Sequence, residues 1–252
     1  MRIALTIAGS DSSGGAGIQA DLKTFAAFGV YGVSAITAVT VQNTMDVDGM
    51  APLSADLVTA QIETVAGDIA IHATKIGMLA TAAIVEAVAA AIRELELPLV
   101  VVDPVLVSTS GERLLDSDGV QALCTELLPL ARVVTPNIPE AEALSGRRIG
   151  SLDDAREAAR RIREMGPSAV IITGGHAPWD LDEGSGLRAE GSTRHVVDLL
   201  FDGDAFHEFR TPRLDSRRTH GTGCTFASAV TASLAAGRIG QRAAEREAGR
   251  HG

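Results

Sequence analysis

Cys224 stands in a glycine-rich turn that leads directly into an apolar helical pattern, within residues 218–230. Gly221 and Gly223 let the backbone turn tightly, so a ligand can approach the main chain closely. The first amides of a helix lack intrahelical acceptors and carry partial positive charge, which suits phosphate. Such a setting also lowers the pKa of a thiol, so we expect Cys224 to exist partly as thiolate. The alternative interpretation is a small buried cysteine at an ordinary helix entry.

Oxygen-bearing side chains at two other positions indicate a cation site. Asp103 closes the apolar run at residues 99–102, where a carboxylate can hold Mg²⁺ directly or through water. Asn137 and Glu140 are three residues apart and could share one side of a helix entry. Helix capping alone would explain Asn137. Taken together, these residues predict a site for Mg²⁺ and nucleotide phosphate.

Three features near the N-terminus suit a small substrate. The glycine-rich residues 9–17 lack both the P-loop Lys-Ser/Thr pair and the dinucleotide spacing. We interpret them as a turn whose backbone contacts a substrate, with a tight strand-to-helix turn as the alternative. Asp21 is either a helix-dipole partner or a substrate acceptor. Gln42 offers a donor and an acceptor to a heteroaromatic base, or is a solvated strand end.

The histidines carry a weaker signal. None of the six shows the spacing of metal ligands. His220 adjoins the glycine turn and could contact phosphate, whereas His72, His195 and His207 are interpreted as surface or edge residues. The sequence has no nucleophile elbow with a Ser-His-Asp order. The chemistry is therefore expected at the Cys224 turn and at the strand ends.

These residues need a scaffold that brings distant segments together. Nearly continuous apolar runs predict buried strands at residues 2–8, 34–41, 73–76, 99–102, 132–135 and 169–173. Helical patterns occupy residues 18–28, 55–66, 81–95, 119–128, 153–165 and 224–236. Ser54 and Asp116 are expected N-caps, and Ser151 with Asp154 resembles a capping box.

The regular alternation ends after Thr173. Residues 174–186 are loop-like, residues 187–189 and 194–202 are expected to pair antiparallel, and residues 207–211 could add a short strand. The repeated β-α-β order predicts one α/β domain over residues 1–240, and residues 241–252 are expected to fray. Its mostly parallel sheet would have helices on both faces and an antiparallel edge.

The predicted sheet places the distinctive residues at one end. In such sheets, ligands bind beyond the carboxyl ends of the strands. The segments expected there are residues 9–11, 42–43, 77–78, 103–104, 137 and 174–176. Their convergence is stronger evidence for a site than any single residue.

Composition excludes several classes of function. The 252 residues carry a formal net charge of −10, which argues against a nucleic-acid partner and weakly against anionic membranes. Aromatic residues make up 3%, so the core must be aliphatic. Cys124 and Cys224 do not form a disulfide framework, and no apolar run is long enough to span a bilayer. We expect a cytoplasmic protein.

Seven motifs together resemble one family. They are residues 4–11, 13–25, 40–44, 75–79, 102–105, 135–140 and the Thr-His-Gly-Thr-Gly-Cys-Thr run at 219–225. The chain is similar over nearly its whole length to the hydroxymethylpyrimidine/phosphomethylpyrimidine kinases of thiamine biosynthesis, which have the ribokinase-like three-layer α/β/α fold. Many sugar kinases of that superfamily carry Asp where Cys224 stands, so the cysteine indicates the pyrimidine branch.

The resemblance implies a role for each matching residue. The pyrimidine pocket would be lined by Gly9, Asp21, Gln42 and Met78. ATP and Mg²⁺ would be organised by Asp103, Asn137 and Glu140, with Asp103 and Glu140 as metal ligands and Thr173 beside the nucleotide. The anion hole would consist of Gly221, Thr222, Gly223 and Cys224. Cys224 would be the general base toward the substrate hydroxymethyl group, and the family suggests a homodimer.

Two departures from the family pattern leave alternatives open. Many members carry Lys where Thr173 stands, and a Lys could neutralise ATP phosphate. The C-terminal region after Gly237 also matches the family poorly. The nearest alternative is a pyridoxine or pyridoxal kinase, because related enzymes share the arrangement of the substrate pocket and the cysteine turn. A protein that binds a pyrimidine without catalysis is the alternative from another class.

Overall fold

A computed structural model describes residues 1–43, 46–107, 111–175, 195–213 and 220–238. The strands are β1 (Ile3–Ser10), β2 (Tyr31–Gln42), β3 (Val47–Pro52), β4 (Ala73–Ile76), β5 (Val100–Val102), β6 (Val133–Val134), β7 (Ala169–Ile172), β8 (His195–Phe201) and β9 (Phe206–Pro212). The helices are α1 (Gly17–Ala27), α2 (Ala55–Asp68), α3 (Ala82–Glu94), α4 (Ser117–Ala122), α5 (Ile138–Ser145), α6 (Leu152–Glu164) and α7 (Thr222–Ala235). Among these residues, no helix is long and apolar enough to cross a membrane.

The strands of the described ranges form one sheet in the order β3-β2-β1-β4-β5-β6-β7-β8-β9. Neighbours from β2 to β7 pair in parallel, whereas β3, β8 and β9 each pair antiparallel with the strand beside them. The fold is therefore α/β with a mostly parallel sheet, as expected. The antiparallel edge formed by β8 and β9 was also expected, whereas the antiparallel β3 at the other edge was not.

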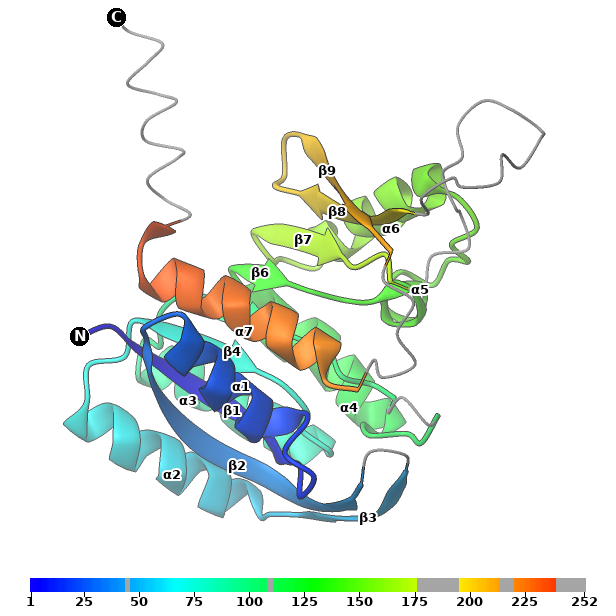
Figure 1. The fold of residues 1–252 in the computed structure, drawn as a ribbon. Helices are drawn as coiled ribbons and strands as arrows, with labels where there is room; N and C mark the ends of the chain where they lie inside the picture. Colours follow the sequence, from blue (N-terminus) through cyan, green and yellow to red (C-terminus); the bar gives the residue numbers. More distant parts are fainter. Residues whose placement is uncertain (44–45, 108–110, 176–194, 214–219, 239–252) are drawn as a thin grey trace, which may run out of the picture.

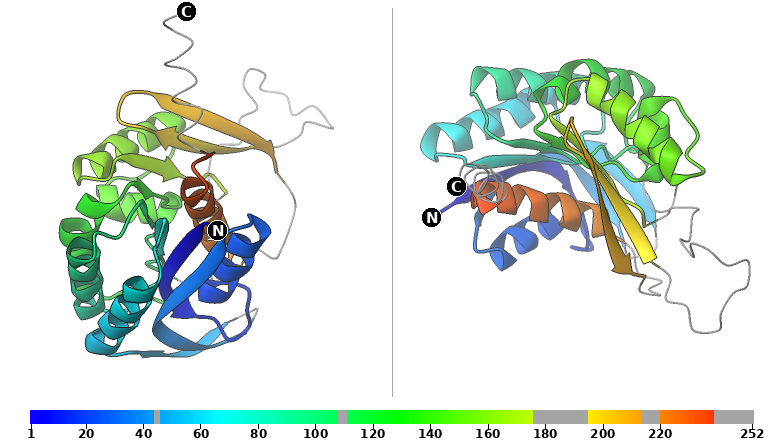
Figure 2. Two further views of the ribbon diagram at one scale, coloured as in Figure 1. Left: turned by 90° about the vertical axis from the view of Figure 1, so that its left-hand side faces the viewer. Right: turned by 90° about the horizontal axis from the view of Figure 1, so that it is seen from above.

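Helices cover both faces of the sheet and complete three layers (Figure 1). Helices α1 and α7 lie side by side on one face, and α2 to α6 cover the other, as the view from above shows (Figure 2). A side chain caps the start of five of these helices, because Ser54, Thr81, Asp116, Asn137 and Ser151 each accept a hydrogen bond from an amide of the first turn. This confirms Ser54, Asp116 and Ser151 as N-caps.

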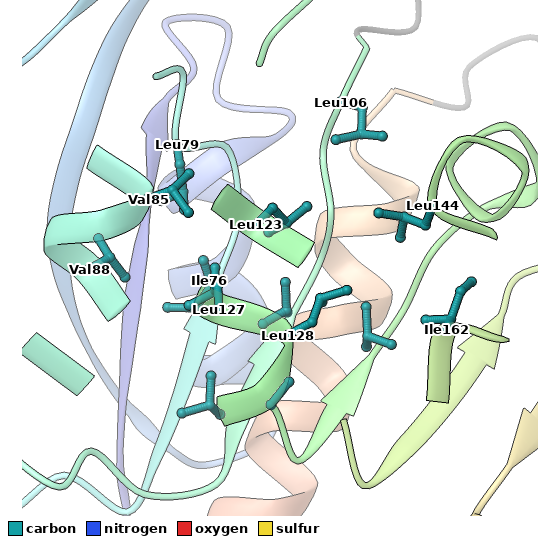
Figure 3. Packing of buried hydrophobic residues seen from close by; sticks show 14 of the residues in the cluster. Ile76, Leu79, Val85, Val88, Leu106, Leu123, Leu127, Leu128, Leu144 and Ile162 are labelled. Carbon is teal, nitrogen blue, oxygen red and sulfur yellow. The ribbon is translucent and has the colours of Figure 1, made fainter. Parts of the chain in front are cut away.

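The largest core cluster lies between the sheet and the α2–α6 layer. It is aliphatic apart from Phe201, in line with the scarcity of aromatic residues. Ile76 from β4 packs there with Val85 and Val88 from α3 and with Leu127 (Figure 3). Cys124 is half-buried against this cluster and contributes to its packing.

Several boundaries differ from the expected ones. Strand β3 was not predicted, because Val47–Pro52 contains Asp, Gly and Pro without an alternating apolar pattern, and such residues are tolerated only at a sheet edge. The helix expected at residues 119–128 ends as α4 at Ala122 and continues as a π turn over Leu123–Leu127. Strand β8 pairs with β7 and β9, and the partner expected at residues 187–189 lies outside the described residues.

The chain order reverses at β1, which has β2 on one side and β4 on the other. The connection through α1 leads from β1 to β2 on one side, and the connection through α2 brings the chain from β3 to β4 on the other. A crevice opens there beyond the carboxyl ends of the strands. The first helix α1 and the last helix α7 flank this point (Figure 1). The fold thus brings the N-terminal and C-terminal glycine turns to the same place.

Candidate active site

A cavity of about 430 Å³ lies beyond the carboxyl ends of β1, β2, β4 and β5. Most of the predicted site residues line it: Gly9, Gln42, Met78, Asp103, Asn137, Glu140, Gly221, Thr222, Gly223 and Cys224. Asp11, Lys75 and His220 also line it. Its size suits a small molecule together with part of a nucleotide.

Asp103 forms part of the floor. It is 5% exposed, and its Oδ2 has no hydrogen-bond partner among the described residues. Lys75 Nζ approaches this oxygen only to 4.0 Å. Burial raises the pKa of Asp103 to about 6, against the lowering effect of Lys75. An enclosed carboxylate oxygen without a partner is the group that a bound cation would stabilise.

Asp21 does not reach the cavity, which corrects its expected role in reading the pyrimidine. Its side chain is fully buried, and its carboxylate accepts hydrogen bonds from Thr6 Oγ1 at 2.6 Å, Ser228 Oγ at 2.7 Å and Lys75 Nζ at 3.0 Å. It also lies beyond the first turn of α1, so it is not a dipole partner. Asp21 instead joins β1, β4, α1 and α7 beneath the site.

Asn137 and Glu140 form a capping box at the start of α5. Asn137 Oδ1 accepts from the Glu140 amide, and Glu140 Oε2 accepts from the Asn137 amide, both at 2.9 Å. Burial, and next the charge of Asp103, raises the pKa of Glu140 to about 8. The capping interpretation of Asn137 is therefore confirmed, and the same box holds the Glu140 carboxylate at the cavity wall.

The glycine turn leads into α7 as expected. Gly221 is the N-cap with a φ of 78°, and Thr225 N donates to Gly221 O at 3.0 Å, so the amides of residues 222–224 belong to the opening turn of the helix. Gly223 comes close to Asp103, because a Cβ built on it would lie 3.9 Å from the carboxylate oxygens. The N-terminal end of α7 therefore faces Asp103.

The surroundings of the half-buried Cys224 oppose the thiolate character that the helix end alone predicts. Burial raises its pKa to about 12. Lys75 and the Gly17 amide lower the pKa, but burial together with the charges of Asp103 and Asp21 outweighs them. The sequence rule considered the helix end alone and could not include two carboxylates from other elements.

The opposite side of the cavity suits a flat heterocycle. Gln42 lines it at the end of β2, and Met78 packs with Ala38, Ala80 and Leu114 in a small apolar cluster. A Cβ on Gly9 would collide with Met78 Cε. The glycine is thus needed so that the methionine can lie against the strand end.

Thr173 is not among the cavity-lining residues. Its amide donates to Pro136 O at 3.0 Å, and it forms a bridge with Asn137 at the same edge of the sheet. His176 lies outside the described residues, so the predicted Gly-Gly-His segment is described only as far as Gly175. Thr173 as a nucleotide-binding residue stays a prediction.

Sequence reasoning missed Lys75 and Asp11 as site residues. Lys75 interrupts an otherwise apolar strand, Ala73–Ile76, and a charged residue in a buried strand is a signal that we could have used. Asp11 was noted only as part of a strand end. Its role comes from contact with His220, which is 209 positions away in the chain.

Comparisons with known proteins decide the family. The profile of the phosphomethylpyrimidine kinase family matches residues 11–248. The chain belongs to this family. A Bacillus subtilis hydroxymethylpyrimidine/phosphomethylpyrimidine kinase is 48% identical over 234 residues, which cover 93% of this chain and 82% of that protein. The protein is accordingly an ATP-dependent kinase, and the alternative of a pyrimidine binder without catalysis loses its support.

Two solved structures are also similar. A crystal structure of phosphomethylpyrimidine kinase from Clostridium difficile has a TM-score of 0.78 and 40% identity, covering 94% of this chain and 92% of that one. An ADP complex of a Bacillus subtilis pyridoxal kinase has a TM-score of 0.79 and 42% identity, covering 94% and 84%. The fold of this kinase family therefore serves more than one acceptor alcohol.

Proposed function

We propose that this kinase transfers the γ-phosphoryl group of ATP to the hydroxymethyl group of 4-amino-5-hydroxymethyl-2-methylpyrimidine, and then a second group to the monophosphate. The product is the pyrimidine pyrophosphate used in thiamine biosynthesis. The observation that carries the proposal is that Gln42, Cys224 and Asp103 line one cavity, together with the opening turn of α7. This cavity provides a heterocycle-reading amide, a base and a phosphate site.

Cys224 is the proposed base. The substrate hydroxyl gives its proton to the sulfur, the hydroxyl oxygen forms a bond to the γ-phosphorus, and the bond from that phosphorus to the ADP oxygen breaks. Because its pKa is raised, the thiol must first release its own proton to water before the sulfur can accept the hydroxyl proton. Lys75 and the Gly17 amide favour this loss, and neutralisation of the Asp103 charge removes an opposing effect. Such base catalysis contributes about 10²–10⁴-fold.

The opening turn of α7 would stabilise the transferred phosphoryl group. Its amides lie in the turn that follows Gly221, and the helix dipole adds to their effect. Phosphoryl transfer depends mainly on positioning and charge neutralisation. The residues 221–224 are therefore the proposed anion hole.

Magnesium fits the oxygen donors that are present. Asp103 has an unpartnered buried oxygen, and Glu140 adds a second carboxylate at the same wall. No group of three or more His, Cys, Asp or Glu residues gathers for a metal within the described ranges. Mg²⁺ is usually bound by one or two carboxylates and by substrate phosphates. Asp103 and Glu140 would hold the ion, and it would neutralise charge on the phosphates.

We also propose that the protein is a cytoplasmic homodimer.

Pyridoxal phosphorylation is the second candidate, favoured by the similarity to a pyridoxal kinase of known structure. The deciding experiment incubates the protein with ATP, Mg²⁺ and either the pyrimidine or pyridoxal, and identifies products by mass spectrometry. Mono- and diphosphorylated pyrimidine, with a larger kcat/KM than for pyridoxal, supports the proposal. Phosphorylated pyridoxal as the preferred product would replace it.

A further inference from the structure

The two glycine turns of the site interlock at the cavity mouth. Gly221 adopts a positive φ, and a Cβ on it would collide with Gly15 O. A Cβ on Gly15 would lie 2.8 Å from His220 Cδ2. The turn that carries His220 is therefore seated directly on the turn that follows Asp11.

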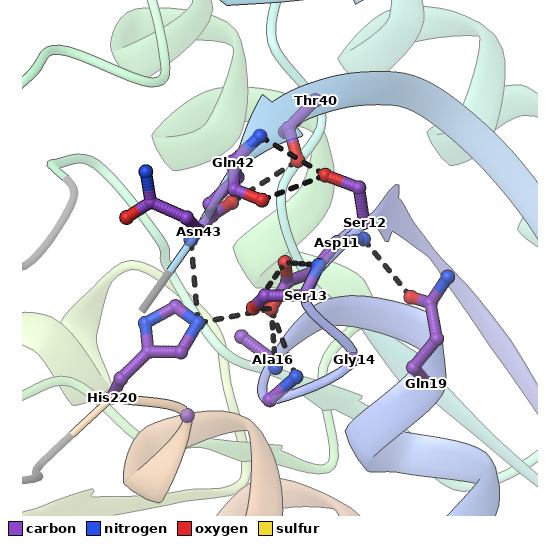
Figure 4. Close-up of polar contacts among 12 residues, drawn as sticks. Asp11, Ser12, Ser13, Gly14, Ala16, Gln19, Thr40, Gln42, Asn43 and His220 are labelled. Atoms are coloured by element: carbon purple, nitrogen blue, oxygen red, sulfur yellow. Dashed lines mark hydrogen bonds and ion pairs between the residues drawn. The ribbon is translucent and has the colours of Figure 1, made fainter. Parts of the chain in front are cut away.

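Asp11 holds His220 in place across this contact. Its carboxylate accepts hydrogen bonds from Ser13 N and Oγ, both at 2.8 Å, Gly15 N at 3.0 Å and Ala16 N at 2.7 Å (Figure 4). His220 Nε2 lies 2.9 Å from the same group. Burial acts to raise the pKa of Asp11, but hydrogen bonds from His220, Ser13 and Ala16 lower it overall. Asp11 is thus an ionised acceptor, so Nε2 of His220 must carry the proton.

That proton decides how the Gln42 amide is oriented. The Gln42 amide nitrogen is assigned 3.3 Å from His220 Nε2, which would set two donors against each other. With the amide reversed, Oε1 accepts from His220 and the NH₂ group donates to Thr40 Oγ1 at the 3.1 Å contact. Thr40 Oγ1 then gives its own proton to Ser10 O, also at 3.1 Å. In this arrangement Asp11 and Gln42 Oε1 share the Nε2–H of His220, and no donor faces another donor.

One amide proton of Gln42 is then left for the ligand, because NH₂ carries two and Thr40 takes one. Gln42 lines the cavity, so this proton is available to a bound heterocycle. We propose that His220 is a positioning residue: its Nε2–H, held by Asp11, fixes Gln42 so that the site presents an N–H donor and selects heteroaromatic alcohols with an unprotonated ring nitrogen. The ligand class rests on the proposed function.

The chain offers a matched control in a second histidine–aspartate pair. His207 Nε2 lies 3.1 Å from Asp202 Oδ2 at the end of the β8–β9 hairpin. Both side chains are exposed, and neither residue lines the cavity. The variants are His220→Leu, which removes the donor, His220→Gln, which restores an amide N–H, and His207→Leu as the control.

Calorimetry without ATP measures the Kd of each variant for 4-amino-5-hydroxymethyl-2-methylpyrimidine. Steady-state kinetics measure the KM values of the pyrimidine and of ATP. We expect His220→Leu to raise the Kd and KM of the pyrimidine about tenfold, since a hydrogen-bonding group in the site loses its orientation. The KM of ATP should change less than twofold. His220→Gln should recover to within about threefold of wild type, and His207→Leu should match wild type. A purely structural role would move both KM values and would not show this recovery.

The proposal is overturned if His220→Leu leaves the pyrimidine Kd unchanged, or if it raises the KM of ATP as much as the KM of the pyrimidine. It is also overturned if His220→Gln binds the pyrimidine as weakly as His220→Leu. A second measurement is independent of activity. Two-bond ¹H–¹⁵N correlations of the ligand-free protein should show His220 as the Nε2–H tautomer, and an Nδ1–H tautomer would also overturn the proposal. If wild type phosphorylates no pyrimidine, the proposed function fails, while the tautomer still tests His220.

Discussion

Lys75 and Asp21 form an ion pair that the protein encloses completely. Lys75 Nζ lies 3.0 Å from each carboxylate oxygen of Asp21, and neither side chain is exposed. Burial alone would lower the pKa of Lys75, but the Asp21 charge raises it well above its usual value. Because Thr6 and Ser228 also donate to Asp21, the pair connects the sheet with both helices of the α1–α7 layer.

Replacing Lys75 with Met should therefore destabilise the protein strongly. The variant leaves the Asp21 charge buried without its cation, which typically costs about 3–5 kcal/mol. Urea unfolding followed by circular dichroism measures the change. The exposed Lys23, which donates to Gly14 O, provides the control. Lys23→Met should stay within about 0.5 kcal/mol of wild type; an equal effect of both variants would contradict a special role for the buried pair.

Cys224→Ala should lower kcat by about 10²–10⁴-fold, since it removes the proposed base. Pyrimidine binding should stay near wild type, because Gln42 and Met78 remain. Product formation and calorimetry measure the two effects separately. Cys124→Ala is the matched control, as Cys124 is half-buried against the core and does not line the cavity. Unchanged turnover in Cys224→Ala would remove the thiol from the mechanism.

Glu140 should make stability depend on pH. Its pKa is raised to about 8, so the folded state binds this proton more tightly than the unfolded state. The corresponding stability is fully present below the unfolded pKa of about 4.3 and is lost as the pH rises through the folded value. Glu140→Gln keeps an acceptor for the Asn137 amide and has no charge to bury.

We compare the free energy of unfolding of Glu140→Gln with that of wild type at each pH. This difference should shift in favour of the variant by about 1 kcal/mol or more from pH 5 to pH 9. Urea unfolding at several pH values measures this gain. Glu94, exposed near the end of α3, provides the control. Glu94→Gln should follow the wild-type pH profile, and parallel profiles for Glu140→Gln and wild type would show that Glu140 is ionised throughout.

Gly221→Ala should reduce both stability and turnover. Alanine at this position would have to adopt a φ of 78°, and its methyl group would collide with Gly15 O, so the turn of the proposed anion hole must move. Gly29 has a φ of 73° with nothing within 4 Å of an added Cβ. Gly29→Ala should therefore cost only about 1–2 kcal/mol with full activity. Comparable turnover in the two variants would show that contact with Gly15 is unimportant.

The fold was predictable where the pattern was local. The apolar runs gave all six central strands, and Ser54 and Asp116 marked helix starts, since a strand covered on both faces and an N-cap are both readable over a few residues. Strand β3 was missed because edge pairing with β2 stabilises a segment that contains Gly49 and Pro52. Its structure depends on a partner and not on its own pattern.

The site was predictable in its members and less so in their roles. Gln42, Asp103 and Glu140 line the cavity because parallel strands and helix starts meet at one edge of the sheet. The buried partner of Asp21 was not predictable, because Lys75 comes from another element. The raised pKa of Cys224 was not predictable either, because it depends on burial and on the charges of Asp103 and Asp21. Electrostatic effects require distances that the order of residues does not contain.

The apolar packing of α7 against α1 also constrains synthesis of the protein. Translation proceeds from the N-terminus, so α1 emerges long before α7. Until α7 is made, Phe25 and Val30 lack Ala232 and Ala235, which pack in the same cluster. A nascent chain that still lacks α7 exposes this apolar surface and has no complete catalytic cavity. The growing polypeptide thus keeps this apolar surface uncovered during elongation, and competence for phosphoryl transfer arises only when α7 has left the ribosome.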